Sequence, residues 1–348
     1  MAVSRMTVQE SPRLGTGKPS RRKFLSRTTV LGATLMARPM IARAEVREVL
    51  IAEPVHSTGY LPLYIGMAQN QFEDVTVKIV TIETGAGHTN AVLSGQAFAF
   101  IGGPEHCAYA KLKGAELRAV VNCVDRGNVY FCAASDQLPM NTDWPSYFKG
   151  RTVATSGYGG TPNSITRYLL KKWNLDATRD VTLVETANSA VLPTVRSKQA
   201  QIGCSTEPFI TQGVRSGVWG EPFINIPKEL GPYAYSTFNV RFATIEKDPE
   251  LVRAFVRGMM KSLKFVDTNR EESAEIAKKQ FPTMALDDLK ATLSRSFADQ
   301  MWSKDGTISQ SSWDTAKAVV MGAGVLKTDV KYDEIIDMSF VNKLKTSL

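Results

Sequence analysis

The chain has three histidines, and each of them follows a predicted β-strand. They are His56, His88 and His106. If the three strands belong to one sheet, the imidazole side chains could converge on one cleft. Three histidines can hold zinc with one open position, and they can equally hydrogen-bond a polar ligand or cap helices. We expect contact with a polar ligand and no metal.

Three glycine-rich turns connect predicted strands to predicted helices, at residues 84–89, 102–106 and 156–162. In open α/β sheets, ligands lie beyond the carboxyl ends of the strands. The N-termini of helices there offer free backbone N–H groups and a partial positive charge, which suits an anion. Each turn could also be an ordinary connection, but three together indicate a small-molecule pocket.

Sequence motifs for cofactors and for common nucleophiles are absent. The chain has no GxGxxG fingerprint and no phosphate-binding loop that ends in Gly-Lys-Ser/Thr. It also has no HExxH, CxxC or GxSxG motif. We therefore expect no cofactor and assign no catalytic residue.

The turns and the polar residues around them provide a set of candidate ligand contacts. Arg126 could bind a carboxylate or sulfonate, although solvation at the surface explains it equally well. Tyr60 and Tyr158 lie inside turns, where a ring with a polar tip suits a small-molecule pocket. The full set is Ser57, Thr58, Tyr60, Gly87, His88, Pro104, Glu105, His106, Arg126, Asn128, Tyr158, Gly159, Gly160, Thr161, Thr206 and Glu207.

Alternating strands and helices must position these residues. Hydrophobic patterning predicts strands at 49–52, 76–80, 98–101, 117–123, 152–155, 181–184 and 202–204. It predicts intervening helices at 59–71, 88–93, 104–111, 161–173 and 190–198. Residues 136–148 resemble a loop, and helices alone follow at 249–266, 271–280, 286–297 and 311–321. This order predicts an α/β fold with two units, each a mostly parallel sheet covered by helices.

The N-terminus resembles an export signal. Residues 20–25 place two arginines before Phe-Leu, and a short apolar stretch follows at 28–36. Residues 42–44, Ala-Arg-Ala, fit a cleavage site. We expect a twin-arginine signal peptide at 1–44, cleaved after about Ala44, so that the twin-arginine export machinery delivers the protein to the periplasm. The alternative is a basic arm before a first helix.

The positive charge of the chain lies in this leader. The formal net charge is +8 for the whole chain. Residues 1–44 hold nine Lys/Arg and one Glu, and the remaining 304 residues hold 33 basic and 33 acidic side chains. The exported part therefore gives no reason to expect nucleic acid as a partner.

The four cysteines show no paired spacing. Cys123 and Cys132 could form a disulfide in an oxidising periplasm. Both lie in apolar stretches, however, so buried free thiols are the more common outcome.

Several segments carry a resemblance to a known family. These are residues 61–65, 93–100, 149–154 and 201–208. From Val46 to Asp267 the chain resembles periplasmic solute-binding proteins of ABC importers for sulfonates, nitrate, taurine and thiamine-precursor pyrimidines. Ala99 stands where the family pattern L-x-x-G-x-x-D usually has Asp, which shows divergence.

The resemblance implies a type II periplasmic binding fold with two lobes that close on a ligand. The first part of lobe 1 would span 45–128, lobe 2 would span 129–235, and residues 236–348 would return to lobe 1, with the return near 233–242. It implies a soluble receptor, expected to be a monomer, that captures a small polar or anionic solute (a sulfonate, carboxylate or pyrimidine-like molecule) and passes it to an ABC permease in the inner membrane.

Two other functions stay open from the sequence. Twin-arginine substrates often carry cofactors, and some relatives of the fold make a pyrimidine from their own histidine. A periplasmic enzyme that is pyrimidine-synthase-like or carries a cofactor is therefore the main alternative. A sensing module that reports to a membrane receptor is the other, and neighbouring genes would separate it from transport.

Overall fold

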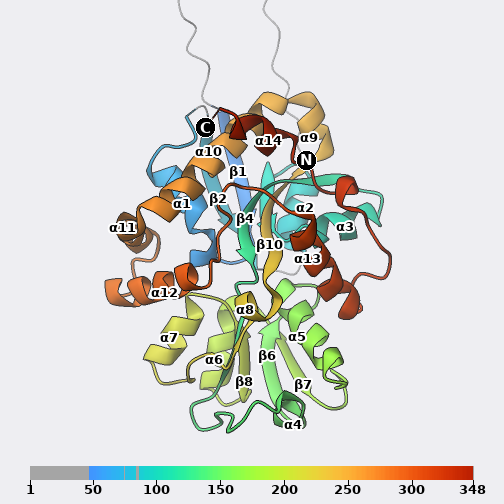
Figure 1. Ribbon diagram of the computed structural model, residues 1–348, viewed down its shortest axis with the longest axis vertical. Helices are drawn as coiled ribbons and strands as arrows, with labels where there is room; N and C mark the ends of the chain where they lie inside the picture. The colour runs from blue at the N-terminus through green and yellow to red at the C-terminus, as the bar shows by residue number, and fades with distance from the viewer. Residues whose placement is uncertain (1–46, 74, 84–85, 348) are drawn as a thin grey trace, which may run out of the picture. The chain divides into compact units, whose positions relative to one another are not determined.

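The computed structural model describes residues 47–73, 75–83 and 86–347 (Figure 1). The expected twin-arginine signal and its cleavage site at 1–44 lie outside the described residues. Within these ranges, no helix is long and apolar enough to cross a membrane.

The first lobe contains a five-stranded sheet in the order β2-β1-β3-β10-β4. Only β10 runs antiparallel to its neighbours. Buried Val and Ile residues on β1 account for its place inside the sheet. The strands are β1 (Arg47–Glu53), β2 (Val75–Thr81), β3 (Ala99–Gly102), β4 (Leu117–Arg126) and β10 (Pro232–Arg241).

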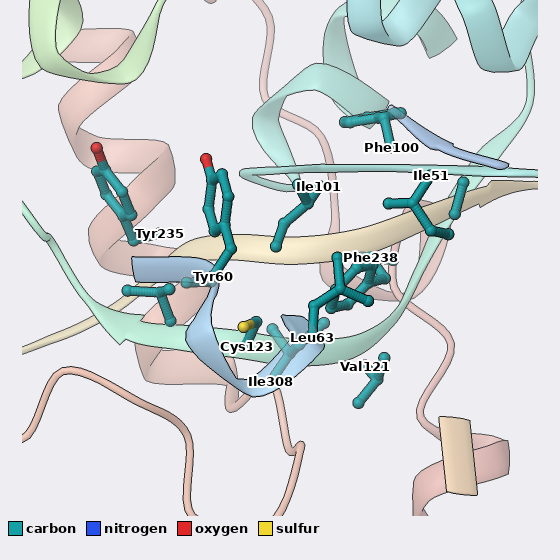
Figure 2. Packing of buried hydrophobic residues seen from close by; sticks show 14 of the residues in the cluster. Ile51, Tyr60, Leu63, Phe100, Ile101, Val121, Cys123, Tyr235, Phe238 and Ile308 are labelled. Atoms are coloured by element: carbon teal, nitrogen blue, oxygen red, sulfur yellow. The ribbon is translucent and has the colours of Figure 1, made fainter. Parts of the chain in front are cut away.

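Helices cover this sheet and bury a continuous apolar core. Figure 2 shows part of that core, where Ile51, Phe100 and Phe238 pack side by side. The 20-residue helix α10 adds Phe255, whose ring lies 5.1 Å from the ring of Phe238. The covering elements are η1 (Thr58–Tyr60), α1 (Leu61–Ala68), α2 (Gly87–Leu93), α3 (Glu105–Lys111), α9 (Phe242–Lys247), α10 (Pro249–Thr268) and α14 (Ser339–Lys345).

The second lobe repeats this arrangement with the sheet order β7-β6-β8-β5-β9. Here only β5 runs antiparallel to its neighbours. Trp219 is 1% exposed and fills the space beside Gly203 and Gly213, where a Cβ atom would collide with the indole. The elements are β5 (Tyr130–Ala133), α4 (Trp144–Phe148), β6 (Thr152–Ser156), α5 (Thr161–Lys172), β7 (Thr182–Thr186), η2 (Asn188–Ala190), α6 (Val191–Arg196), β8 (Ile202–Ser205), α7 (Phe209–Arg215), β9 (Ile224–Asn225) and α8 (Ile226–Leu230).

The chain passes between the two sheets twice. Residues 127–129 lead from β4 into β5, and Gly231 leads from α8 into β10. The register of β10 against β4 begins at Pro232, which pairs with Arg126. The lobe limits expected at 128 and 235 stay a prediction, although both lie within a few residues of these passages.

The C-terminal helices contact both lobes. They are α11 (Arg270–Gln280), α12 (Leu286–Ala298) and α13 (Gln310–Gly322), followed by η3 (Tyr332–Glu334). Helix α12 packs beside α7 of the second lobe, and α13 packs beside α5 (Figure 1). The contact with α7 includes an ion pair between Arg215 and Asp288, with 3.2 Å between Nε and Oδ1.

One segment differs from its sequence-based prediction. Residues 136–148 were expected to form a loop, but α4 occupies Trp144–Phe148. The Asp143 side chain accepts a hydrogen bond from the backbone N–H of Ser146, and Pro145 lies in the first turn. The residues that suggested a loop are therefore a helix cap and a helix-starting proline.

The four cysteines are buried free thiols, as expected. Cys123 lies in β4 and Cys132 in β5, which belong to different sheets. The disulfide considered between them is absent.

Truncation of Phe255 should destabilise the first lobe. The ring is fully buried and lies 5.4 Å from the rings of Phe72 and Phe98 as well as close to Phe238. Phe255→Ala should therefore lower the free energy of unfolding by about 3–5 kcal/mol, as measured by chemical denaturation. Phe255→Leu, which keeps most of the volume, should cost less than half of that. Equal losses for the two variants would contradict this packing account.

Candidate functional site

A cavity of about 280 Å³ lies where the two lobes face each other. Most of its walls come from residues at or just beyond the carboxyl ends of β1, β2 and β3 of the first sheet and β6, β7 and β8 of the second, and Asn128, Tyr235 and Ser236 complete them. The residues that line it are Pro54, Val55, Ser57, Tyr60, Ile82, Glu83, His88, Gly102, His106, Asn128, Ser156, Gly157, Gly160, Thr161, Pro162, Glu185, Thr186, Ala187, Asn188, Thr206, Tyr235 and Ser236. The two sheets thus present their ligand-binding edges to the same space.

The turn after β1 places Ser57 in the wall, and the passage from β4 to β5 places Asn128 beside it. The Ser57 hydroxyl accepts a hydrogen bond from the backbone N–H of Gly59 and so caps η1. A Cβ atom on Gly59 would lie 2.7 Å from Nδ2 of Asn128. Glycine is needed there because the Asn128 amide comes so close to the backbone. Oδ1 of Asn128 is buried and has no hydrogen-bond partner.

Two tyrosines connect the apolar core to the cavity. Figure 2 shows the rings of Tyr60 and Tyr235 side by side, with both hydroxyls directed away from Leu63 and Phe238. Both rings are buried, and both residues line the cavity. Burial raises the pKa of each phenol, so both hydroxyls stay protonated. They can donate as well as accept hydrogen bonds.

His88 and His106 lie together in the cavity wall. Their ring centroids are 4.9 Å apart and the rings meet edge to face. Burial lowers the pKa of His88 to about 3, with a further contribution from His106, and burial lowers the pKa of His106 to about 4. Both rings are therefore neutral near pH 7. Each neutral imidazole offers one donor and one acceptor.

The ring nitrogens of His88 have no partner, although the residue is only 3% exposed. The side chain lies close to the end of β3, where a Cβ atom on Gly102 would come within 3.3 Å of Nε2. Buried nitrogens without partners cost free energy unless a ligand or water satisfies them. His88 is therefore prepared for a polar ligand.

The second lobe contributes hydroxyl groups and a carboxylate. Oγ1 of Thr206 is buried without a partner. The Ser156 hydroxyl accepts from the backbone N–H of Asn163, which fixes the start of α5. Oε1 of Glu185 accepts from Nδ2 of Asn163 at 3.0 Å and from Nη2 of Arg167 at 2.6 Å. This network holds the Glu185 carboxylate at the cavity wall.

Three hydroxyl groups bridge the lobes around the cavity. The Ser57 hydroxyl donates to the backbone carbonyl of Glu207 at 2.7 Å. Thr161 donates to the Glu105 carboxyl group at 2.7 Å, and Ser189 donates to the Glu83 carboxylate at 2.6 Å. The lobes are therefore in direct contact beside the cavity.

Half of the predicted contact residues line this cavity. They come from both lobes and from the passage between them, and they are Ser57, Tyr60, His88, His106, Asn128, Gly160, Thr161 and Thr206. The structure therefore brings together residues from six separate segments. That they bind the ligand stays a prediction.

The other half of the predicted set lies outside the lining. Thr58 is buried behind the first turn, and Gly87, Pro104 and Gly159 belong to the turns without reaching the cavity. Tyr158 is 57% exposed, with the Arg167 guanidinium 5.2 Å above its ring. The remaining three, Glu105, Arg126 and Glu207, hold the lobes and their connections together.

Arg126 and Glu207 make contacts that explain them structurally. Arg126 donates to the carbonyl of Pro227 and to the side chain of Gln300. Glu207 is fully buried, and Oε1 accepts from Nε of Arg295 at 2.8 Å. Burial raises the pKa of Glu207, although Thr211 and Arg295 oppose that shift. These contacts tie the second lobe to the C-terminal part of the chain.

His56 lies away from the other two histidines and outside the cavity lining. Nδ1 is 3.0 Å from Oε1 of Glu53, and Nε2 is 3.2 Å from the carbonyl oxygen of Gln280. Glu53 is fully buried and also accepts from Tyr64 and Thr81. The expected convergence of three histidines is thus wrong for His56. This residue joins β1 to the end of α11 instead.

Sequence reasoning missed two groups of lining residues. Glu185 to Asn188 lie at the carboxyl end of β7 and just beyond it, and the rule that ligands lie at strand ends would have found them. Tyr235 and Ser236 lie within the long strand β10, and no sequence signal marks them. Across the described ranges, no group of three or more His, Cys, Asp or Glu residues is arranged to hold a metal.

Comparisons with known proteins agree with this fold. A family model described as NMT1/THI5 like matches residues 57–273. Over 304 residues, the chain is 21% identical to YtlA of Bacillus subtilis (strain 168), named as a candidate binding protein, and the alignment covers 85% of this chain and 90% of that one.

Solved structures of other binding proteins have a similar fold. The ligand-binding component of an ABC-type import system from Staphylococcus aureus, determined with zinc bound, has a TM-score of 0.69 at 14% identity and covers 85% of this chain and 98% of its own. The periplasmic nitrate-binding protein NrtA from Synechocystis PCC 6803 has a TM-score of 0.72 at 13% identity. Its alignment covers 87% of this chain and 89% of NrtA. The expected two-lobed periplasmic binding protein fold is confirmed. Both structures are described as binding proteins, not as enzymes.

Removal of the His56 imidazole should change how stability depends on pH. Burial lowers the pKa of His56, but the hydrogen bond and charge of Glu53 and the Gln280 carbonyl raise it more, so the pKa lies above 6.5. The stabilisation is then fully present below about pH 6.5 and is lost as the pH rises through the raised value. His56→Phe keeps the ring contacts with Tyr64 and Phe281 but cannot be charged.

Denaturation of wild type and His56→Phe at several pH values tests this point. The stability difference between the two proteins should be larger at pH 5.5 than at pH 8.5. A difference that does not change with pH would show that His56 contributes only by packing.

Proposed function

The chain belongs to the NMT1/THI5-like family, and from this premise we propose that it is the substrate-binding component of an ABC importer. One observation carries the proposal: polar atoms of His88, Asn128 and Thr206 are buried without partners in a cavity between two lobes. A solute that fills the cavity would supply the missing hydrogen bonds. Such a receptor needs an inner-membrane permease as its partner.

The cavity suits a small solute. Its volume of about 280 Å³ lies at the lower end of the range of roughly 300–1,000 Å³ that is common for small-molecule pockets. The walls combine apolar side chains, such as Val55 and Ile82, with hydroxyl, amide and imidazole groups. A peptide or an oligonucleotide would not fit between lobes that already touch.

The charges around the cavity favour an uncharged solute over an anion. Among the described lining residues there is no Lys or Arg, whereas Glu83 and Glu185 are both present. The two histidines are neutral, as their lowered pKa values show. A sulfonate or carboxylate would lose water without gaining a cationic partner, which costs free energy.

Among the three solute classes considered, a pyrimidine-like heterocycle fits these groups best. Its ring nitrogens and exocyclic groups would act as both donors and acceptors, which matches the imidazole, amide and hydroxyl groups of the wall. The rings of Tyr60 and Tyr235 would provide flat apolar surface. We propose this class for the cavity.

The protein would meet its solute in the periplasm. The twin-arginine signal, with cleavage after about Ala44, remains part of this proposal, as does the export machinery that reads it. It is supported by the order of the arginine pair, the apolar stretch and the small residues in the sequence. Export in a folded state would suit a protein whose chain passes between its lobes twice.

Loss of the unpartnered groups should weaken solute binding. Mass spectrometry of material that co-purifies with the protein would identify the solute, and calorimetry would give its Kd. Asn128→Ala and Thr206→Val each remove one hydrogen bond, worth about 1 kcal/mol, so each should raise Kd roughly fivefold. Asn141→Ala, on an exposed segment, should leave Kd unchanged. Unchanged binding in both cavity variants would place the solute elsewhere.

Replacement of the arginine pair should block export. Arg21→Lys together with Arg22→Lys keeps the charge but removes the pair that the export machinery reads. Fractionation of cells should then show uncleaved protein in the cytoplasm, whereas Arg5→Lys should export normally. Periplasmic protein of mature size from the double variant would overturn the twin-arginine assignment.

A further inference from the structure

Glu105 is a buried acid at the contact between the lobes. It is the first residue of α3 in the first lobe, and it is fully buried. Oε1 accepts a hydrogen bond from Oγ1 of Thr161, the first residue of α5 in the second lobe, at 2.7 Å. Thr161 in turn lines the cavity. The carboxyl group therefore orients a hydroxyl of the cavity wall across the cleft.

The second oxygen of this carboxyl group is unsatisfied. Oε2 of Glu105 is buried without a hydrogen-bond partner. It lies so close over Gly103 that a Cβ atom there would clash with it. Among the described residues, no Lys, Arg or His forms an ion pair with Glu105. A carboxylate in such a place has lost its water and gained only neutral donors, the Thr161 hydroxyl and its own backbone N–H.

The groups around Glu105 do not compensate its negative charge. On α3 itself they are Cys107 and Tyr109, and on β10 they are Tyr233 and Tyr235. Helix α5 supplies the Thr161 hydroxyl. Burial raises the pKa of Glu105 to about 7, although the bond from Thr161 and its own backbone N–H oppose the shift. The neighbouring His106 is neutral because burial lowers its pKa.

We propose that Glu105 is a positioning residue that couples closure of the two lobes to the uptake of a proton. When the lobes separate, water reaches the carboxylate and stabilises its charge. When they close, the water leaves and Thr161 replaces it with a single hydroxyl. Closure is then easier with the acid protonated. The inference rests on the proposed function, because it concerns the closure by which such a receptor would hold its solute.

The other two hydroxyl bridges between the lobes do not bury a titratable group. Ser57 donates to a backbone carbonyl, which does not titrate. Glu83 accepts from Ser189, but Glu83 is exposed, so water can still reach its carboxylate. Of the three hydroxyl bridges, the one through Glu105 places a fully buried titratable group between the lobes. Glu83 is therefore a matched control, with the same kind of bond and different burial.

The direction of the effect follows from the change in pKa. An ordinary Glu titrates near 4.5, whereas Glu105 in the closed form titrates near 7. Between these values, each step to lower pH favours the closed form. Above pH 7, closure must bury an ionised carboxylate. The ratio of closed to open molecules should change by on the order of 100-fold across this window.

Distances between labels on the two lobes would test the coupling without any solute. Spin labels at Lys113→Cys and Asp136→Cys report on the first and second lobe, and both positions are exposed. The four native cysteines are buried. In solute-free protein, the population at the short distance should grow as the pH falls from 8.5 to 5. Glu105→Gln should show the short distance at every pH, because the amide imitates the protonated acid.

Matched variants distinguish an effect of Glu105 protonation from an effect of the hydrogen bond between the lobes. Glu83→Gln should keep the pH dependence of the wild type. Thr161→Val should lower the closed population but keep its dependence on pH, since burial of Glu105 remains. Equal pH dependence in wild type and Glu105→Gln, or constant distances in the wild type, would overturn the proposal. Because no solute is used, these outcomes do not depend on whether the importer function is right.

A second measurement covers the case in which Glu105→Gln fails to fold. NMR of carboxyl carbons labelled with 13C in wild-type protein gives the titration midpoint of Glu105 directly. The expected result is a midpoint near pH 7 in the closed form. A midpoint near 4.5 would overturn the proposal.

Discussion

The site depends on one constraint. Polar atoms at the facing edges of the two sheets lose contact with water and need other hydrogen-bond partners. Parallel strands end at the same edge, and the turns that follow them carry hydroxyl, amide and imidazole groups. When two such edges meet, each polar atom must find a partner or cost free energy. Ser57, Thr161 and Ser189 find partners in the opposite lobe. His88, Asn128 and Thr206 do not, and their unmet bonds define where a solute would bind.

The C-terminal part of the chain determines how the two lobes are held. Asp299, just after α12, accepts hydrogen bonds from Tyr130 and Asn225 of the second lobe. Three residues later, Nε1 of Trp302 donates to the carbonyl of Gly59 in the first lobe. Arg295 adds an ion pair with the buried Glu207. The short segment from Arg295 to Trp302 therefore contacts both lobes.

The three histidines show how position decides the use of one residue type. His56 lies between two acceptors, a carboxylate and a carbonyl, and only the charged ring can donate to both. His88 and His106 lie in the cavity wall, and burial keeps them neutral. The charged ring stabilises the fold, and the neutral pair is available to a solute. Together with the missing Lys and Arg among the described lining residues, this is the basis for proposing an uncharged solute.

The sequence by itself determined the succession of strands and helices, because hydrophobic periodicity and turn residues act locally. It also located the turns after β1, β3 and β6, since polar residues directly after a buried strand can be recognised along the chain. It could not show that β10 brings Tyr235 and Ser236 to the cavity, or that Glu105 and Glu207 accept hydrogen bonds from Thr161 and Arg295. Those outcomes depend on contacts between residues far apart in the chain. The tertiary structure decided these contacts, because it determines which groups lose water and which partners lie within hydrogen-bond distance.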